Sequence, residues 1–169
     1  MDDANLSELL TNTKGKQFWI KQWGDPDKEA DFELQSTTDL EISIDFSQKP
    51  NSIKIGDVLI IHRIKHAKIM FVAEVTSESS ESTPADFQKE YWREKWNWRI
   101  KTRNLTPVYG GQWKENSLKS FALAKEYNEA NPSNAVNIGR LNFGAHVRVS
   151  EDFAKFIFKE IMQLDDING

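Results

Sequence analysis

The spacing of apolar and polar residues in the first two thirds of the chain is typical of short β-strands. Alternation is clearest over 17–23, where Trp19, Lys21 and Trp23 share one face and the residues between them share the other. A second alternating stretch covers 40–46. We therefore expect a strand in each segment, each with one face turned towards a core.

Two continuous apolar runs, 58–64 and 69–75, follow each other closely along the chain. Runs of this kind indicate strands that are buried on both faces. Their short connection predicts an antiparallel hairpin. A further strand is expected over 96–102, with Trp96 and Trp98 on the same face.

Helical spacing appears in two segments towards the C-terminal end. Asn116 is expected to cap a helix over 117–130, which ends at Asn131-Pro132, and Ser150 is expected to cap a second helix over 151–164. The apolar stripe expected on the first helix consists of Leu118, Phe121, Ala122 and Ala124.

Strands in the middle of the chain and helices at its margins predict an α+β domain with a small, mostly antiparallel barrel. We expect residues 17–165 to form this domain and residues 1–16 to form an N-terminal lead-in. The length of 169 residues suits one such domain with a sizeable core.

The amino-acid composition excludes several classes of protein. Apolar residues make up 38% and charged residues 28%, which is a globular balance. The absence of cysteine excludes disulfides and thiolate metal sites and fits a cytoplasmic location. No apolar run approaches 18 residues and the acidic N-terminus lacks an apolar segment, so we expect neither a membrane partner nor a secretory signal.

Charge and tryptophan are unevenly distributed. Residues 61–125 hold 12 basic and 7 acidic side chains, a net charge of +5 in a chain whose overall charge is −4. This segment is either a basic face for nucleic acid or an ordinary solvated surface. Three of the six tryptophans fall within seven residues beside Tyr91. Tryptophans in such a cluster are either core or contact surface.

The sequence offers no catalytic or metal-binding motif. His62 and His66, on an extended segment, would stand about 13 Å apart, too far to share one metal ion. There is no nucleophile elbow, no phosphate-binding loop and no metalloprotease motif. We therefore expect no enzymatic activity, no metal and no cofactor.

Three blocks taken together resemble EVE and YTH domains of the PUA-like superfamily. They are Gln17 to Asp25 (QFWIKQWGD), Lys54 to Ser77 (KIGDVLIIHRIKHAKIMFVAEVTS) and Asn137 to Val147 (NIGRLNFGAHV). The resemblance implies a PUA-like barrel that binds DNA or RNA and holds one modified base, such as methylated cytosine or adenine, in an aromatic pocket. It leaves the base, the choice between DNA and RNA, and the oligomeric state open.

The resemblance also suggests site residues. Lys21, Gln22 and Trp23 match the family's first-strand pocket residues, and Tyr91, Trp92 or Trp96 matches an aromatic wall. Arg140 matches a residue that contacts the phosphate backbone. The basic side chains Arg99 and Lys101 are further candidates for phosphate contacts. Two alternatives remain: a protein-interaction or structural domain without a ligand, and a small nucleic-acid hydrolase of the ASCH type.

Overall fold

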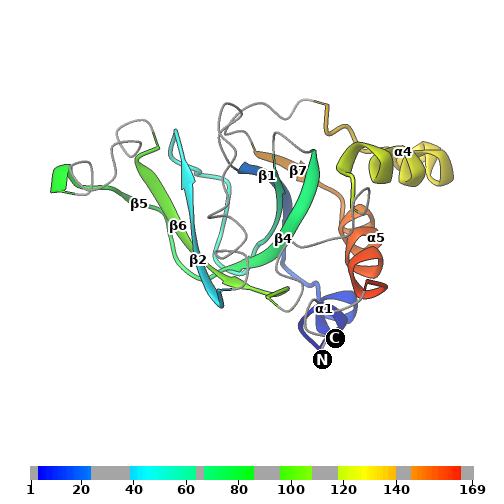
Figure 1. The fold of residues 1–169 in the computed structure, drawn as a ribbon, viewed down its shortest axis with the longest axis horizontal. Helices are drawn as coiled ribbons and strands as arrows, with labels where there is room; N and C mark the ends of the chain where they lie inside the picture. Colours follow the sequence, from blue (N-terminus) through cyan, green and yellow to red (C-terminus); the bar gives the residue numbers. More distant parts are fainter. Residues whose placement is uncertain are drawn as a thin grey trace.

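The computed structural model describes residues 4–23, 39–63, 67–85, 96–107, 118–139 and 146–164. Seven strands form one curved, mixed sheet (Figure 1). In chain order they are β1 (Phe18–Trp23), β2 (Glu41–Phe46), β3 (Val58–Arg63), β4 (Lys68–Val75), β5 (Ser80–Glu81), β6 (Trp98–Asn104) and β7 (His146–Val149).

Strand pairing runs β2-β6-β4-β3-β1-β7 across the sheet, and β5 pairs with β6. The pair β1–β3 is parallel and the other pairs are antiparallel, including the expected β3–β4 hairpin. Within the described residues the edge strands β2 and β7 do not pair with each other. The sheet therefore stays open along a line between β2 and β7, which we call the seam.

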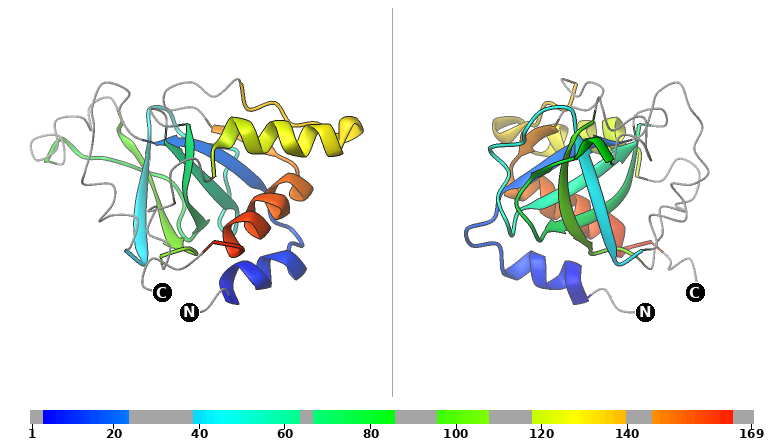
Figure 2. Two further views of the ribbon diagram at one scale, coloured as in Figure 1. Left: turned by 45° about the vertical axis from the view of Figure 1, so that its right-hand side comes forward. Right: turned by 90° about the vertical axis from the view of Figure 1, so that its left-hand side faces the viewer.

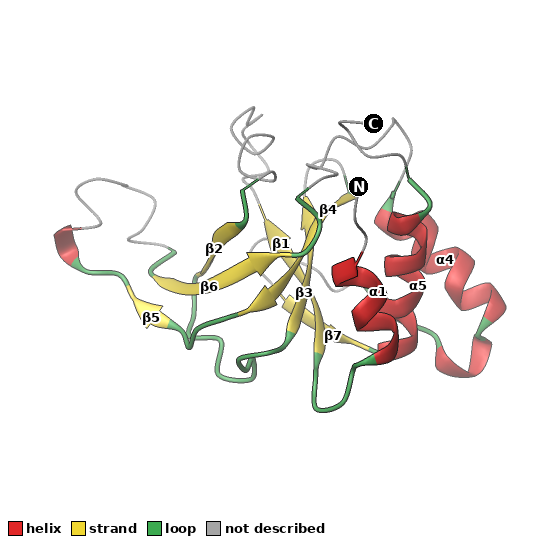
Figure 3. Ribbon diagram, turned by 90° about the horizontal axis from the view of Figure 1, so that it is seen from below, coloured by secondary structure: helices red, strands yellow, loops and turns green. Residues whose placement is uncertain are grey.

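Three α-helices, α1 (Ala4–Thr11), α4 (Ser120–Ala130) and α5 (Glu151–Met162), lie on one side of the sheet, and a short 3-10 helix, η2 (Pro132–Asn134), follows α4 (Figures 1 and 3). The strands β2 and β6 lie on the side away from the helices (Figure 2). The expected α+β class with a mostly antiparallel, curved sheet is confirmed, with an open seam in place of a closed barrel.

The two faces of the sheet carry separate hydrophobic cores. Alternation along β1 sends Phe18 and Ile20 into the core beneath the helices, and Trp19 into the core inside the curved sheet. Every residue of β3 except Arg63 is buried, as its continuous apolar run predicted. The segment expected as a lead-in contributes as well, because Leu6 and Leu9 of α1 are buried in the helix-side core.

Two helix-end predictions at described positions are confirmed, whereas α5 ends at Met162 instead of at the predicted position 164. The Ser150 hydroxyl accepts a hydrogen bond from the Phe153 amide at 3.2 Å at the start of α5. At the other predicted end, α4 stops at Asn131, whose side-chain amide donates to the Tyr127 carbonyl at 2.9 Å. Asn116, the expected cap of α4, lies outside the described residues.

The start and the buried face of α4 differ from the prediction. Leu118 has a φ of 51° and Lys119 is extended, so the helix begins at Ser120 instead of 117. Leu118 instead joins the sheet region, where its carbonyl accepts from the Ile69 amide at 3.0 Å. The helix buries Ser120, Leu123, Ala124 and Tyr127, and it leaves the predicted core residues Phe121 and Ala122 exposed.

Candidate functional site

The most unusual residue of the described chain is Lys21, a lysine buried inside the curved sheet. Its side chain lies on the same face of β1 as Trp19 and is 1% exposed. The ammonium nitrogen lies 4.8 Å from the centre of the Phe46 ring and 5.5 Å from that of Trp96. It also donates a hydrogen bond to the Gln22 carbonyl at 2.7 Å. Aromatic faces attract cations, so the two rings offset part of the lost hydration.

A histidine from the neighbouring strand adds a further ring to the group around Lys21. His146 of β7 pairs across the sheet with Lys21. Its ring makes edge-on contacts with Trp19 and Phe46, each with ring centres 5.5 Å apart. Because Phe46 is on β2, this contact spans the seam between the two edge strands. We call Trp19, Lys21, Phe46, Trp96 and His146 the Lys21 site.

The Lys21 site is electrostatically perturbed. Burial lowers the pKa of Lys21 from 10.5 to about 7, although the nearby carboxylate of Asp45 opposes this change. Burial also lowers the pKa of His146, and the positive charge of Lys21 lowers it further. Near pH 7 the site therefore holds an amine that is about half protonated beside a neutral imidazole.

Asp57, which is not itself part of the Lys21 site, holds the Trp19 ring of that site in place. It is 1% exposed, and its carboxylate accepts from the Trp19 indole at 3.1 Å, the Gln17 amide at 3.1 Å and the Lys54 amide at 2.9 Å. The Gly-Asp turn therefore connects the strand β1 to the start of β3 and orients the Trp19 ring. No local signal along the chain indicated this role of Asp57, because its partner Gln17 lies 40 positions away.

Gln22 points to the opposite side of the sheet from Lys21. Its side-chain oxygen accepts a hydrogen bond from Nδ1 of the buried His62, and its exposed fraction is 5%. The ring of His62 contacts Phe121 of α4 edge-on, with centres 6.0 Å apart. Burial lowers the pKa of His62 to about 4, which keeps the ring neutral. The structure thus separates Gln22 from Lys21, although the two were predicted to share a pocket.

Arg99 and Lys101, the candidate phosphate-binding residues of β6, are on its outer face, since the alternate residues Ile100 and Thr102 are buried. Lys101 is exposed, whereas Arg99 is half-buried and binds Asp45 at 3.1 Å. Asp45 lies between the buried residues Ile44 and Phe46 of β2, so its ion pair with Arg99 is on the outside of the sheet. The structure therefore places a basic strand face on the outside of the sheet and the Lys21 site on the inside.

Several predicted site residues cannot be placed. Tyr91, Trp92 and Arg140 lie outside the described residues, and for Trp23 only the backbone is described, at the end of β1. Of the six predicted pocket residues, the structure brings together the side chains of Lys21 and Trp96. Their role in binding a base stays a prediction.

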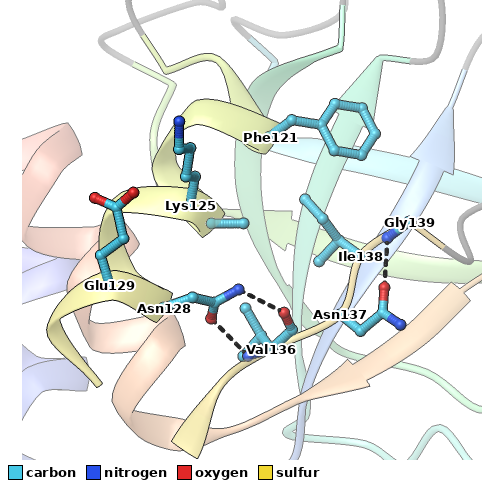
Figure 4. Close-up of a pocket in the computed structure, with 9 residues that line it drawn as sticks. Phe121, Lys125, Asn128, Glu129, Val136, Asn137, Ile138 and Gly139 are labelled. Atoms are coloured by element: carbon cyan, nitrogen blue, oxygen red, sulfur yellow. Dashed lines mark hydrogen bonds between the residues drawn. The ribbon is translucent and has the colours of Figure 1, made fainter. Parts of the chain in front are cut away.

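A separate surface groove lies between α4 and the segment that follows η2 (Figure 4). Its volume is about 430 Å³, and its lining includes Phe121, Lys125, Glu129 and Ile138. Asn128 braces it by donating to the Val136 carbonyl at 2.9 Å and accepting from the Val136 amide at 2.7 Å. One lysine and one glutamate leave its lining without net charge, so it differs from the basic face of β6.

Two other features are absent from the described part of the chain. It contains no group of three or more histidine, aspartate or glutamate side chains placed to hold a metal ion. None of its helices has the length and apolar character needed to span a membrane.

The fold is similar to several solved structures. A hypothetical protein from Leishmania major matches with a TM-score of 0.57 and 15% identity, over 90% of this chain and 99% of that one. Human THYN1, solved in complex with DNA containing 5-methylcytosine, matches with a TM-score of 0.56 and 12% identity, over 88% and 99%. Rpa0253 from Rhodopseudomonas palustris matches with a TM-score of 0.51 and 13% identity, over 90% and 98%.

These likenesses show that the chain shares the fold of these three proteins. No protein-family model matches the chain. A search of curated proteins also finds no match.

Proposed function

We propose that this protein is a nucleic-acid-binding module that holds one modified base at the Lys21 site and does no chemistry on it. The observation that carries the proposal is a lysine buried among aromatic rings at the seam of a PUA-like sheet. Burying an ammonium group is unfavourable, and an apolar residue of similar size often gives a more stable core. A binding role accounts for a lysine at this position.

The rings of the Lys21 site are suited to a planar ligand. Trp96 and His146 are half-buried, whereas Lys21 and Phe46 are buried. Stacking of an aromatic side chain on a nucleobase contributes about 1–3 kcal/mol per base. Burial of a methyl substituent adds about 0.8 kcal/mol. Stacking favours any base over water, and burial of the methyl group adds a preference for a methylated base over an unmodified one.

The charge pattern supports a polyanionic partner. The basic face of β6 carries Arg99, Lys101 and Arg103 at alternating positions on the outside of the sheet. Asp45 and Glu74 partly neutralise Arg99 and Arg103. This balance favours moderate, salt-dependent attraction to a phosphate backbone, with selectivity left to the base.

The test is fluorescence anisotropy with short single-stranded oligonucleotides that carry one 5-methylcytosine, one N6-methyladenine or no modification. The protein should bind one modified oligonucleotide more tightly than its unmodified counterpart. Replacement of Trp96 with alanine should weaken this binding by about tenfold or more, through loss of a stacking ring.

The matched control is Phe121→Ala, which removes an exposed aromatic ring from α4 on the other side of the sheet. This variant should bind like the wild type. The proposal is wrong if the wild type binds no oligonucleotide, or if the two alanine variants lose affinity equally.

A further inference from the structure

We propose that the groove between α4 and the segment after η2 is a docking site for an extended peptide of a partner protein, which pairs through its main chain with Ile138. The groove lies on the helix side of the sheet, because Ala124 and Ile138 of its lining belong to the helix-side core. The Lys21 site is inside the curved sheet, beside Trp19 of the other core. The docking site is therefore independent of the proposed base-binding function.

The main chain of the segment beside α4 is paired at one residue and open two residues later. The Val136 amide donates to the Asn128 side-chain oxygen at 2.7 Å, and the Val136 carbonyl accepts from the Asn128 side-chain nitrogen at 2.9 Å. Among the described residues, none forms a hydrogen bond with the main chain of Ile138, although Ile138 is only 3% exposed. Main-chain groups without a partner are rare and unfavourable at such a position.

The extended course of this segment turns the open groups of Ile138 towards α4. Ala135 has extended dihedral angles, φ −65° and ψ 142°, and the side chains of Asn137 and Ile138 point to opposite sides (Figure 4). In an extended chain, the main-chain N–H and C=O groups of every second residue face the same side. Because those of Val136 meet α4, those of Ile138 face α4 as well.

The helix leaves the space opposite Ile138 unfilled. Ala124 lies one helical turn before Asn128 on the same face of α4, and its methyl group offers no polar atom to Ile138. Both helix residues line the groove, whose volume of about 430 Å³ is within the range of ligand sites, about 300–1,000 Å³. An amide group that enters the groove there would bind Ile138 as Asn128 binds Val136.

The main chain of a peptide supplies such an amide. In an antiparallel pair, one residue donates its N–H to the carbonyl of its partner residue and accepts from the partner's N–H, which are the two bonds that Ile138 lacks. Extended peptides bind other proteins in this way, through main-chain hydrogen bonds and pockets for alternate side chains. Ala124, Val136 and the 50% exposed ring of Phe121 give the groove an apolar lining for one of these side chains.

Two charged residues of the lining indicate the sequence of the peptide. Lys125 and Glu129 are exposed and lie four residues apart on α4, and no ion pair joins these two described residues. Their spacing of one helical turn, about 5.4 Å, is close to the spacing of about 6.6 Å between alternate residues of a strand. An acidic and a basic residue two positions apart on the peptide would therefore complement them.

The order of these two peptide residues follows from the direction of the chain. The segment from Val136 to Gly139 runs opposite to α4 (Figure 4). A peptide that is antiparallel to the segment therefore passes Lys125 before Glu129, so its acidic residue precedes its basic residue. A phosphate backbone would meet Glu129 as a like charge, so the lining favours a peptide over a nucleic acid.

The test is an NMR titration of the ¹⁵N-labelled protein with two blocked peptides of equal composition. The matched peptide is acetyl-Thr-Leu-Glu-Val-Lys-Thr-amide, and the charge-swapped peptide is acetyl-Thr-Leu-Lys-Val-Glu-Thr-amide. The matched peptide should bind with a Kd of about 1 mM or lower, and the amide proton signal of Ile138 should move downfield as it gains an acceptor. The charge-swapped peptide should bind at least about fivefold more weakly.

Exchange of the two charges on α4 isolates their role. The double variant Lys125→Glu with Glu129→Lys should prefer the charge-swapped peptide, so that the order of affinities is reversed. Both positions are exposed, and the fold should not change. The matched control is Lys159→Glu, which reverses the charge of an exposed lysine on α5 and should retain the wild-type preference.

Two variants test the apolar lining and the main-chain contact. Phe121→Ala should weaken binding of the matched peptide by about tenfold. Ala124→Asn places a carboxamide opposite Ile138, and it should weaken binding by at least about tenfold while moving the Ile138 amide signal downfield without peptide. Neither variant should change oligonucleotide binding, and Trp96→Ala should retain the wild-type affinity for the peptide.

The outcomes separate the docking site from the base-binding function. If the Ile138 signal shows no saturable shift, or if the wild type binds both peptides equally, the docking site is overturned and the base-binding function stands. Displacement of the matched peptide by the unmodified oligonucleotide would assign the groove to nucleic acid and overturn the docking site as well. A protein that binds the matched peptide but no oligonucleotide would retain the docking site and overturn only the base-binding function.

Discussion

Replacement of Lys21 with methionine should stabilise the fold at neutral pH, because it removes a charge that folding must dehydrate. The pKa of Lys21 falls from 10.5 to about 7 on folding. At about 1.4 kcal/mol per pKa unit, this fall corresponds to a cost of about 4 kcal/mol at pH 7. Methionine has a similar length and no charge, so it fits the same apolar surround.

Two lost interactions reduce the gain. The variant gives up the hydrogen bond to the Gln22 carbonyl, about 1.5–3 kcal/mol for a charged donor, and part of the cation–π attraction to Phe46 and Trp96. The net stabilisation expected at pH 7 is therefore about 1–2 kcal/mol. This value lies within the range found when buried charges are replaced by apolar residues.

The free-energy cost of burying Lys21 depends on pH. The folded-state pKa of Lys21 is depressed, so between pH 7 and pH 10.5 the unfolded chain binds more protons than the folded one. The unfolding free energy of the wild type therefore rises between pH 7 and pH 10.5, as the cost of burying Lys21 falls. The advantage of the methionine variant should therefore vanish between about pH 8 and pH 9, and the wild type should be the more stable protein at pH 10.

Urea unfolding of the wild type and of Lys21→Met at pH 7 and pH 10, followed by circular dichroism, measures the difference. A variant that is less stable than the wild type at pH 7 would refute the reasoning. So would a stability difference that does not change with pH, since it would mean that the Lys21 amine is hydrated in the folded protein.

Two further predictions concern residues that support the site. Asp57→Ala should lower the unfolding free energy by about 2–4 kcal/mol in urea titrations. The reason is that it leaves donors from Gln17, Trp19 and Lys54 without their acceptor. A loss below about 0.5 kcal/mol would show that water replaces the carboxylate. The wild type should also lose up to about 3 kcal/mol as the pH falls from 6.5 to about 4, because burial depresses the pKa of His62 and the unfolded chain takes up the proton first. In His62→Gln, most of this acid sensitivity should disappear, and the remainder should reflect His146; an unchanged pH profile would contradict the assignment.

The sequence predicted the elements whose local pattern was strong. The buried hairpin β3–β4 and the Ser150 cap follow from apolar runs and from a capping residue before an amphipathic segment. The start of α4 was wrong because Leu118 adopts a left-handed conformation to reach the sheet, and local helical spacing cannot reveal such a contact. The four-residue strand β7 was missed because HVRV is too short to show a period.

The candidate site was harder to predict, because it depends on contacts between residues far apart in the chain. The resemblance to EVE and YTH domains indicated Lys21 and Trp96. It gave no indication that Gln22 would pair with His62 on the other face of the sheet. Alternation along β1 carried that information, since neighbouring residues of a strand face opposite sides. His146 and Asp57 had no local signal, because His146 acts where β1, β2 and β7 meet and Asp57 acts where β1 meets the turn before β3.

The central claim, that a modified base lies among the rings of the Lys21 site, can be tested most directly by NMR of an oligonucleotide whose 5-methylcytosine carries a ¹³C-labelled methyl group. On binding, the methyl proton signal should move upfield because of the aromatic rings around it, and it should show nuclear Overhauser contacts to Trp96 or Phe46. A complex in which the methyl signal keeps its free position and shows no contact to these rings would contradict the account.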